Sequence, residues 1–163
     1  MIKVKQANAV SAYNVLKQIK TKELPAEVAI VIWKNVKNLK ATATSYEEAI
    51  KDAKESLKGE NDDEMNKLLE ELQKKETDEA AGKYTFTRTD NENRAKVTEY
   101  YQNAQIKLNK FIKDLDNKEV EVEVVTLSED DLIKSLIGTD FNIGIIELIS
   151  FLFEDNPFDT DKA

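Results

Sequence analysis

A heptad pattern runs from Pro25 to Lys58, and it limits most strongly what this chain can fold into. Apolar or small residues recur there in alternating steps of four and three: Ile32, Val36, Leu39, Ala43, Tyr46, Ile50, Ala53 and Leu57. This spacing is typical of a helix that packs along a seam against another helix. Pro25 suits the first turn of such a helix, and Gly59 suits its end. We therefore predict one helix near residues 25–58, about 50 Å long from the helical rise per residue.

A second heptad pattern predicts the partner of this helix, near residues 90–116. Its apolar positions are Val97, Tyr101, Ala104, Leu108, Phe111 and Leu115. A helix of this length cannot be packed on all sides in a chain of 163 residues, so we expect the two to run antiparallel as a protruding hairpin near residues 25–116. The segment 62–80 predicts a shorter helix between them. Another helix is expected from Asn8 to Lys20, with Asn8 as its cap.

Strict alternation marks a strand in "KEVEVEVV", where Val120, Val122 and Val124 face one way and the glutamates between them face the other. One strand cannot satisfy its own backbone, so partners must exist. Residues 1–6 offer Lys3 and Lys5 on one face, which would stand beside the glutamates. Residues 83–89 also alternate. We predict a sheet of two or three strands from residues 1–6, 83–89 and 119–127.

The end of the chain predicts two further helices. Ser128 followed by Asp131 resembles a capping box, so a short helix should run from Glu129 to Ile137 and end at Gly138. The stretch "DFNIGIIELISFLFED" predicts an apolar C-terminal helix. The expected fold class is α+β and mostly α-helical, with two long antiparallel heptad helices, a small sheet and this last helix. We expect one domain over residues 1–155 and a flexible tail over 156–163.

Composition narrows the function classes. The chain has no cysteine and no histidine, which removes thiolate nucleophiles, Cys/His zinc sites and Ser-His triads. Its four glycines are scattered singly, so there is no phosphate-binding loop. We therefore expect a protein that is not an enzyme, with no catalytic residues, no cofactor and no metal site. A carboxylate-bound Mg²⁺ enzyme is the alternative, and a thermal shift with Mg²⁺ or a nucleotide would reveal it.

The charge and hydropathy pattern bears on partners and location. The net charge is −8, and only two of the 24 basic residues are arginine, so direct nucleic-acid binding is disfavoured and a basic protein partner is favoured. No apolar run approaches the length of a membrane span, and the N-terminus lacks the apolar core of a signal peptide. We expect a soluble protein of the cytoplasm with no membrane contact.

The candidate contact residues are acidic or aromatic. Glu119, Glu121 and Glu123 would project about 7 Å from one another along a strand, near the phosphate spacing of a nucleic acid, although a solvated face neutralised by lysines is the simpler interpretation. Phe153 and Phe158 would form either an apolar patch for a partner or part of the core. Trp33 is expected to pack where the first long helix meets the second, and an exposed interface position is the alternative.

The order of these segments resembles a family of small uncharacterised proteins of bacteriophages and prophages from firmicute-like hosts. The resemblance covers most of the chain and is carried by "IKVKQANAVSAYNVL", "LPAEVAIVIWKNVKNL" with "YEEAIKDA", "GKY", "NKEVEVEVVTL" and "IIELISFLFED". It implies a strand, a helix, a Leu-Pro break, a long helix, an alternating strand and an apolar C-terminal helix. It implies no catalytic residue.

Two function hypotheses follow. The first is a phage protein that binds and blocks a host component such as a defence nuclease, with the acidic face as a mimic of the phosphate backbone. The second is a component of the virion or of its assembly that forms a symmetric homo-oligomer through the apolar C-terminal helix.

Overall fold

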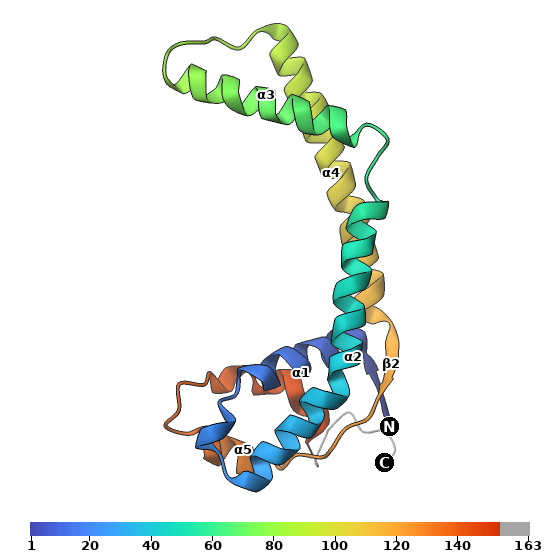
Figure 1. The fold of residues 1–163 in the computed structure, drawn as a ribbon, viewed down its shortest axis with the longest axis vertical. Helices are drawn as coiled ribbons and strands as arrows, with labels where there is room; N and C mark the ends of the chain where they lie inside the picture. The colour runs from blue at the N-terminus through green and yellow to red at the C-terminus, as the bar shows by residue number, and fades with distance from the viewer. Residues whose placement is uncertain (154–163) are drawn as a thin grey trace. The chain divides into compact units, whose positions relative to one another are not determined.

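The computed structural model describes residues 1–153, and 75% of them are helical. Figure 1 shows their path. In chain order the elements are β1 (Ile2–Lys5), α1 (Gln6–Gln18), the 3-10 helix η1 (Thr21–Glu23), α2 (Ala26–Ser56), α3 (Asp62–Ala80), α4 (Arg88–Asn117), β2 (Glu119–Val122), α5 (Glu129–Leu136) and the 3-10 helix η2 (Ile143–Leu152). The predicted class, a mostly helical α+β fold, is confirmed. None of the described helices is long and apolar enough to cross a membrane.

The chain divides into two compact units. The first contains residues 1–49 and the chain from Asp114 onward, and the second contains residues 50–113. Both long helices contribute to both units, since the boundaries fall inside α2 and inside α4. Their bounds lie within two residues of the predicted ones.

The sheet of the first unit is a single antiparallel pair, β1 with β2. The register places Ile2 opposite Val122 and Val4 opposite Val120, so the apolar face is continuous. On the other face Lys3 stands opposite Glu121 and Lys5 opposite Glu119. The lysines therefore lie beside the glutamates on the exposed side, as predicted. Beyond β2 the chain makes one isolated parallel bridge, between Leu127 and Phe153.

The first helix starts earlier than predicted. It begins at Gln6, directly after β1, and Lys5 precedes it without a side-chain cap. The expected Asn8 cap is wrong, because the helix begins two residues earlier. The first amide of the helix, that of Gln6, is satisfied by a backbone group instead, since it donates to the carbonyl of Lys118 at 2.8 Å. The turn between β1 and α1 is therefore held by the residue that precedes β2. The core side of this segment is formed by Ala9, Ala12, Val15, Leu16 and Ile19.

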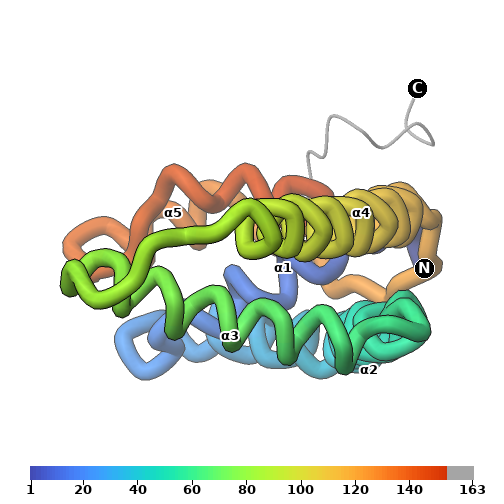
Figure 2. Tube along the Cα trace, turned by 90° about the horizontal axis from the view of Figure 1, so that it is seen from above, coloured from blue at the N-terminus to red at the C-terminus, as the bar shows by residue number. Residues whose placement is uncertain are grey.

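The C-terminal helix forms, but as a 3-10 helix rather than an α-helix. Its sequence explains this difference, since Ile143, Ile146, Ile149 and Leu152 recur every third residue, which is the period of a 3-10 helix. The last three are buried. Figure 2 shows α1 between α2 on one side and the α5–η2 segment, orange to red, on the other. The buried faces of these elements make the core of the first unit.

The second unit contains α3 and most of α4 around a smaller core. Met65, Leu72 and Val97 are its buried residues, with aromatic and leucine side chains packed against them. The bounds of α3 are those predicted from the sequence. At the start of this unit Gly59 lies under the ring of Tyr100, and a Cβ at that position would come within 3.1 Å of the ring. A side chain at position 59 would crowd the ring of Tyr100, so glycine suits this position after α2.

The predicted third strand at residues 83–89 is wrong. Residues 84–87 have no regular structure, and α4 has already begun at Arg88. The physical reason is a capping box: Thr87 Oγ1 accepts from the amide of Asp90 at 3.1 Å, and a carboxylate oxygen of Asp90 accepts from the amide of Thr87 at 3.0 Å. The aromatic residues of this alternating stretch have separate local contacts: Phe86 packs on the small core of the second unit, and the hydroxyl of Tyr84 donates to Asp90.

Candidate functional site

The acidic face lies where the alternation predicted it. Glu119, Glu121 and Glu123 are all exposed, although β2 ends at Val122, so Glu123 lies one residue beyond the strand. Lys3 reaches Glu121 at 3.9 Å, whereas Lys5 bonds to Asn117 at 3.0 Å instead of to Glu119. A separation of 3.9 Å between two exposed side chains makes a weak ion pair. Of the two lysines expected to neutralise the face, only Lys3 therefore contacts one of its glutamates.

Of the two aromatic candidates, Phe153 lies in the described part of the chain and Phe158 does not. Phe153 is 6% exposed and belongs to the core of the first unit. Its amide donates to Ser150 and its backbone pairs with Leu127. Phe153 therefore fills the core rather than an exposed patch. Phe158 lies outside the described residues, as does the predicted tail.

An exposed aromatic patch occurs instead on α2. Trp33 is 60% exposed and Ile30, one turn earlier, is 52% exposed, so the expectation that Trp33 packs between the long helices is wrong. The core side of this helix is already filled by Val28, Ile32, Asn35 and Leu39, and Trp33 points away from it. The ammonium of Lys37 lies 5.6 Å from the centre of the indole ring, within the range of a cation–π contact.

Basic residues follow this patch along α2. Lys34, Lys37 and Lys40 are exposed, and no acidic residue lies between Glu27 and Glu47. A protein with a net charge of −8 thus carries a local cationic and aromatic surface. We name Glu27, Ile30, Trp33, Lys34 and Lys37 the outer face of α2. Exposed apolar patches with a polar rim are typical of interaction sites, and Trp is enriched in binding hot spots.

Asn35 fixes the opposite side of the same helix. It is fully buried, and its amide nitrogen donates to the carbonyl of Val125 at 2.8 Å while its oxygen accepts from the amide of Val125 at 2.9 Å. The Asn35 amide thus makes the two hydrogen bonds that a neighbouring strand would otherwise make to the backbone of Val125. This pair of bonds sets the rotation of α2, and with it the direction of the outer face.

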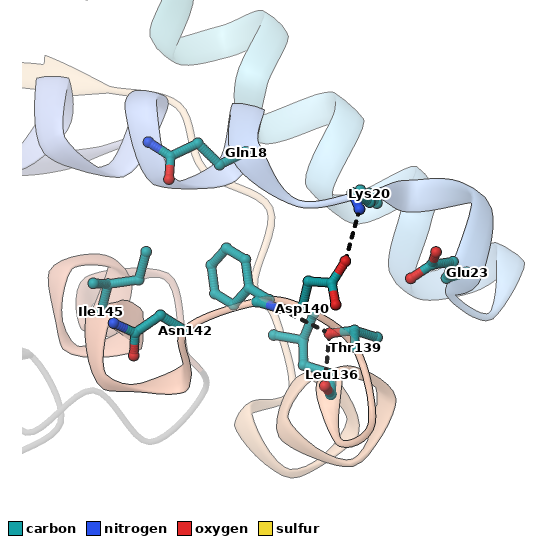
Figure 3. A pocket seen from close by; sticks show the side chains of 9 residues that line it. Gln18, Lys20, Glu23, Leu136, Thr139, Asp140, Asn142 and Ile145 are labelled. Carbon is teal, nitrogen blue, oxygen red and sulfur yellow. Dashed lines mark hydrogen bonds and ion pairs between the residues drawn. The ribbon is translucent and has the colours of Figure 1, made fainter.

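The first unit also contains a cavity of about 250 Å³, shown in Figure 3. Leu136, Phe141 and Ile145 supply its apolar wall. Lys20 and Asp140 form an ion pair of 3.2 Å at its rim, and both side chains are largely exposed. The volume is below that of most small-molecule sites. The lining offers neither a nucleophile paired with a base nor a buried acid.

A smaller cavity, about 240 Å³, lies in the second unit beside Leu57 and Leu108. Tyr100 lines it, and its hydroxyl donates to Asp62 at 2.7 Å and accepts from the amide of Gly59 at 3.2 Å. The bond to Asp62 raises the pKa of Tyr100 above its usual value of 10.0. These contacts attach the loop after α2 to α4, so the tyrosine has a structural task.

The most highly connected carboxylate is Asp90. Its side chain is 4% exposed and accepts from Lys75 at 2.6 Å, from the hydroxyl of Tyr84, and from the hydroxyl of Thr87 at 2.8 Å as well as the Thr87 amide. The Lys75 ammonium, then Tyr84 and the Thr87 amide, lower the pKa of Asp90 well below the usual 3.8. All of its acceptor capacity is used in holding the start of α4 to α3 and to residues 84–87.

Carboxylates do not gather into a metal site in the part of the chain that the structure describes. No group of three or more Asp, Glu, His or Cys side chains there could hold an ion. Glu119 and Glu121 lie on the exposed face of β2 and belong to no such group.

Comparison with known proteins adds no relative: no family model, no curated protein and no solved structure matches the chain.

Proposed function

We propose that this chain is a bacteriophage-encoded protein without catalytic activity that acts by binding another protein through the outer face of α2. One observation carries the proposal: Trp33 and Ile30 are both more than half exposed and lie one helical turn apart. An aromatic and an aliphatic side chain of this size lose most on exposure to water and gain most when a partner covers them.

The polar clusters support the absence of catalysis in this proposal. Asp90, the carboxylate with the largest shift in pKa, is saturated with hydrogen bonds to its own fold. A general acid or base needs to exchange a proton with a substrate. Asp90 is buried and its oxygens accept hydrogen bonds from its own fold, so it is not available for that exchange. Tyr46 is similar, since its hydroxyl donates to Asp116 at 2.6 Å.

Two biological roles are compatible with such a protein. The role proposed first is to bind and block a host component, such as a defence nuclease, in the cytoplasm of the bacterial host. The second role is in the virion or its assembly, through contacts between copies of the chain. The order of charges along the outer face of α2 favours this second role.

The acidic strand face is a second candidate surface for the blocking role. Glu119 and Glu121 project from the same face of β2, and Glu119 makes no ion pair with the lysine opposite it. A basic partner could use both carboxylates. If a host nuclease binds equally well after Glu119, Glu121 and Glu123 are all changed to Lys, the acidic face is not its contact surface.

Affinity purification from infected cells tests the proposed function. The wild-type chain should retain a specific protein that Trp33→Ala loses, whereas Ile106→Ala should retain it. Ile106 is a suitable control because it is 66% exposed on α4 and lies outside the outer face of α2. Equal recovery by wild type and Trp33→Ala would contradict the proposed surface. Turnover of a nucleotide or a phosphoester by the pure protein, lost on an Asp or Glu substitution, would contradict the absence of catalysis.

A further inference from the structure

The charges on the outer face of α2 follow a definite order. Glu27 lies before the apolar pair Ile30 and Trp33, and Lys34 and Lys37 follow it. All five side chains are exposed, and the segment from Ala26 onward is one helix. Along the helix axis the face is therefore negative, then apolar, then positive. Such an order is complementary to itself when a second copy is turned to run in the opposite direction.

The helical geometry supports this pairing quantitatively. A two-fold axis midway between Ile30 and Trp33 would place each of these residues opposite the other in the second copy. From that midpoint Glu27 lies about 7 Å along the helix, and Lys34 and Lys37 lie about 4 and 8 Å in the other direction, from the rise of an α-helix. After the two-fold rotation, Glu27 of one copy lies between Lys34 and Lys37 of the other.

The positions of Glu27 and Lys34 around the helix axis also fit the antiparallel pairing. Glu27 and Lys34 are seven residues apart, close to two full turns, so they project from the same side of the helix. A two-fold axis perpendicular to the plane of two antiparallel helices keeps that side common to both. Each dimer would thus contain two equivalent Glu27–Lys34 contacts, and the indole rings would cover the isoleucines of the opposite copy.

We propose that the partner of the outer face of α2 is a second copy of this chain, in an antiparallel two-fold dimer. This inference rests on the proposed function, because it names the occupant of the same surface. A parallel arrangement would place Glu27 beside Glu27 and the lysines beside lysines, which like-charge repulsion disfavours. Closed two-fold dimers are also the commonest form of homo-oligomer.

The contact is small, which sets the strength that we expect. Three turns of helix on each side fall at the low end of interface sizes, where association is weak and reversible. Sedimentation velocity of the wild-type chain should therefore show a monomer at low concentration and a dimer as the concentration rises toward about 1 mM. Trp33→Ala should weaken dimerisation about a hundredfold, as loss of a central aromatic does. Ile106→Ala should leave it unchanged.

Charge reversal distinguishes this geometry from nonspecific association. Glu27→Lys alone would set lysine against lysine, and Lys34→Glu alone would set glutamate against glutamate, so each should dimerise about tenfold more weakly than wild type. Mixed together, these two variants should form a heterodimer, since both contacts between positions 27 and 34 then join opposite charges. The double variant Glu27→Lys/Lys34→Glu restores the same two contacts and should dimerise more tightly than either single variant, whereas the retained Lys37 keeps it weaker than wild type. Glu47→Lys, an exposed change elsewhere on α2, is the matched control.

The outcomes separate this inference from the proposed function. A wild-type chain that stays monomeric up to about 1 mM, or single variants that gain nothing on mixing, would overturn the dimer. If the chain is monomeric but Trp33→Ala still loses a protein from infected cells, the surface binds another protein and only the inference about a second copy fails. If Trp33→Ala changes neither dimerisation nor capture, both fail.

Discussion

Asn35 offers the sharpest test of how the first unit is held together. Its amide makes two bonds, of 2.8 and 2.9 Å, to the backbone of Val125, and the side chain is fully buried. Asn35→Ala would leave a backbone N–H and a backbone C=O without partners. Each group costs about 1.5 kcal/mol when it is deprived of a partner in a partly buried position, so the free energy of unfolding should fall by about 3 kcal/mol.

Urea unfolding followed by tryptophan fluorescence would measure this loss. Trp33 is the only tryptophan of the chain and lies in the same unit, so its emission reports on the unit that Asn35 stabilises. At a slope of about 2 kcal/mol per molar urea, the midpoint should fall by about 1.5 M. Asn14→Ala is the control, since Asn14 is exposed on α1 and undergoes the same gain in helix propensity. If both variants have the same midpoint, the two bonds to Val125 do not stabilise the fold.

Three further predictions concern polar and close contacts. The pKa of Asp90 is lowered in the folded chain, so its contribution to stability is complete above about pH 4 and is lost as the pH falls further. Thermal scans should therefore show that the melting temperature of Asp90→Asn falls less on acidification than that of wild type. Parallel curves of melting temperature against pH would contradict this. Burial and the bond to Asp116 raise the pKa of Tyr46 to about 12, so its contribution is complete below about pH 10 and is lost as the pH rises, and Tyr46→Phe should flatten the alkaline part of the stability profile. Gly59→Ala should cost about 1 kcal/mol in urea unfolding, because a Cβ would stand 3.1 Å from the ring of Tyr100; an equal cost in a Tyr100→Ala background would show that the ring is not the cause.

The periodic parts of the sequence predicted the helices and the sheet pairing well. Heptads set the bounds of α2 and α4 within two residues, and the Val/Glu alternation predicted that the lysines of β1 would lie beside the glutamates of β2. Ser128 caps α5 through the amide of Asp131 at 3.3 Å, as its capping box indicated. In all these cases the signal lies in neighbours along the chain, which is where sequence reasoning is strongest.

The errors had both local and distant causes. Residues 83–89 alternate like a strand, yet no partner strand reaches them, and Asp90 uses them to cap α4. Thr87 followed by Asp90 was the local signal for that cap. Asn8 looked like a cap, but Lys118, far along the chain, satisfies the first amide of α1. The three-residue repeat of Ile143, Ile146, Ile149 and Leu152 was the local signal for a 3-10 helix, and the prediction of an apolar C-terminal helix did not use it.

The candidate surface could be predicted only in part. The acidic face was placed by its alternation, whereas Trp33 was assigned to a helix contact because its apolar neighbours Ile30 and Val31 suggested burial. Which side of α2 faces the core depends on Asn35 and its bonds to Val125, ninety residues later. The heptad seam itself was the sequence signal for the orientation of the helix, because its residues Ile32, Leu39 and Ala43 are buried and Trp33 lies about 100° away from Ile32 around the helix.

The quenching of Trp33 fluorescence by acrylamide tests most directly whether the outer face of α2 is a self-association surface. In dilute solution the indole is 60% exposed and should be quenched readily. At concentrations where the chain associates, the quenching constant should fall several-fold as the second copy covers the ring, and Glu27→Lys should remain quenchable at the same concentration. Identical quenching of the wild-type chain when dilute and when associated would show that copies meet elsewhere, and would contradict the account.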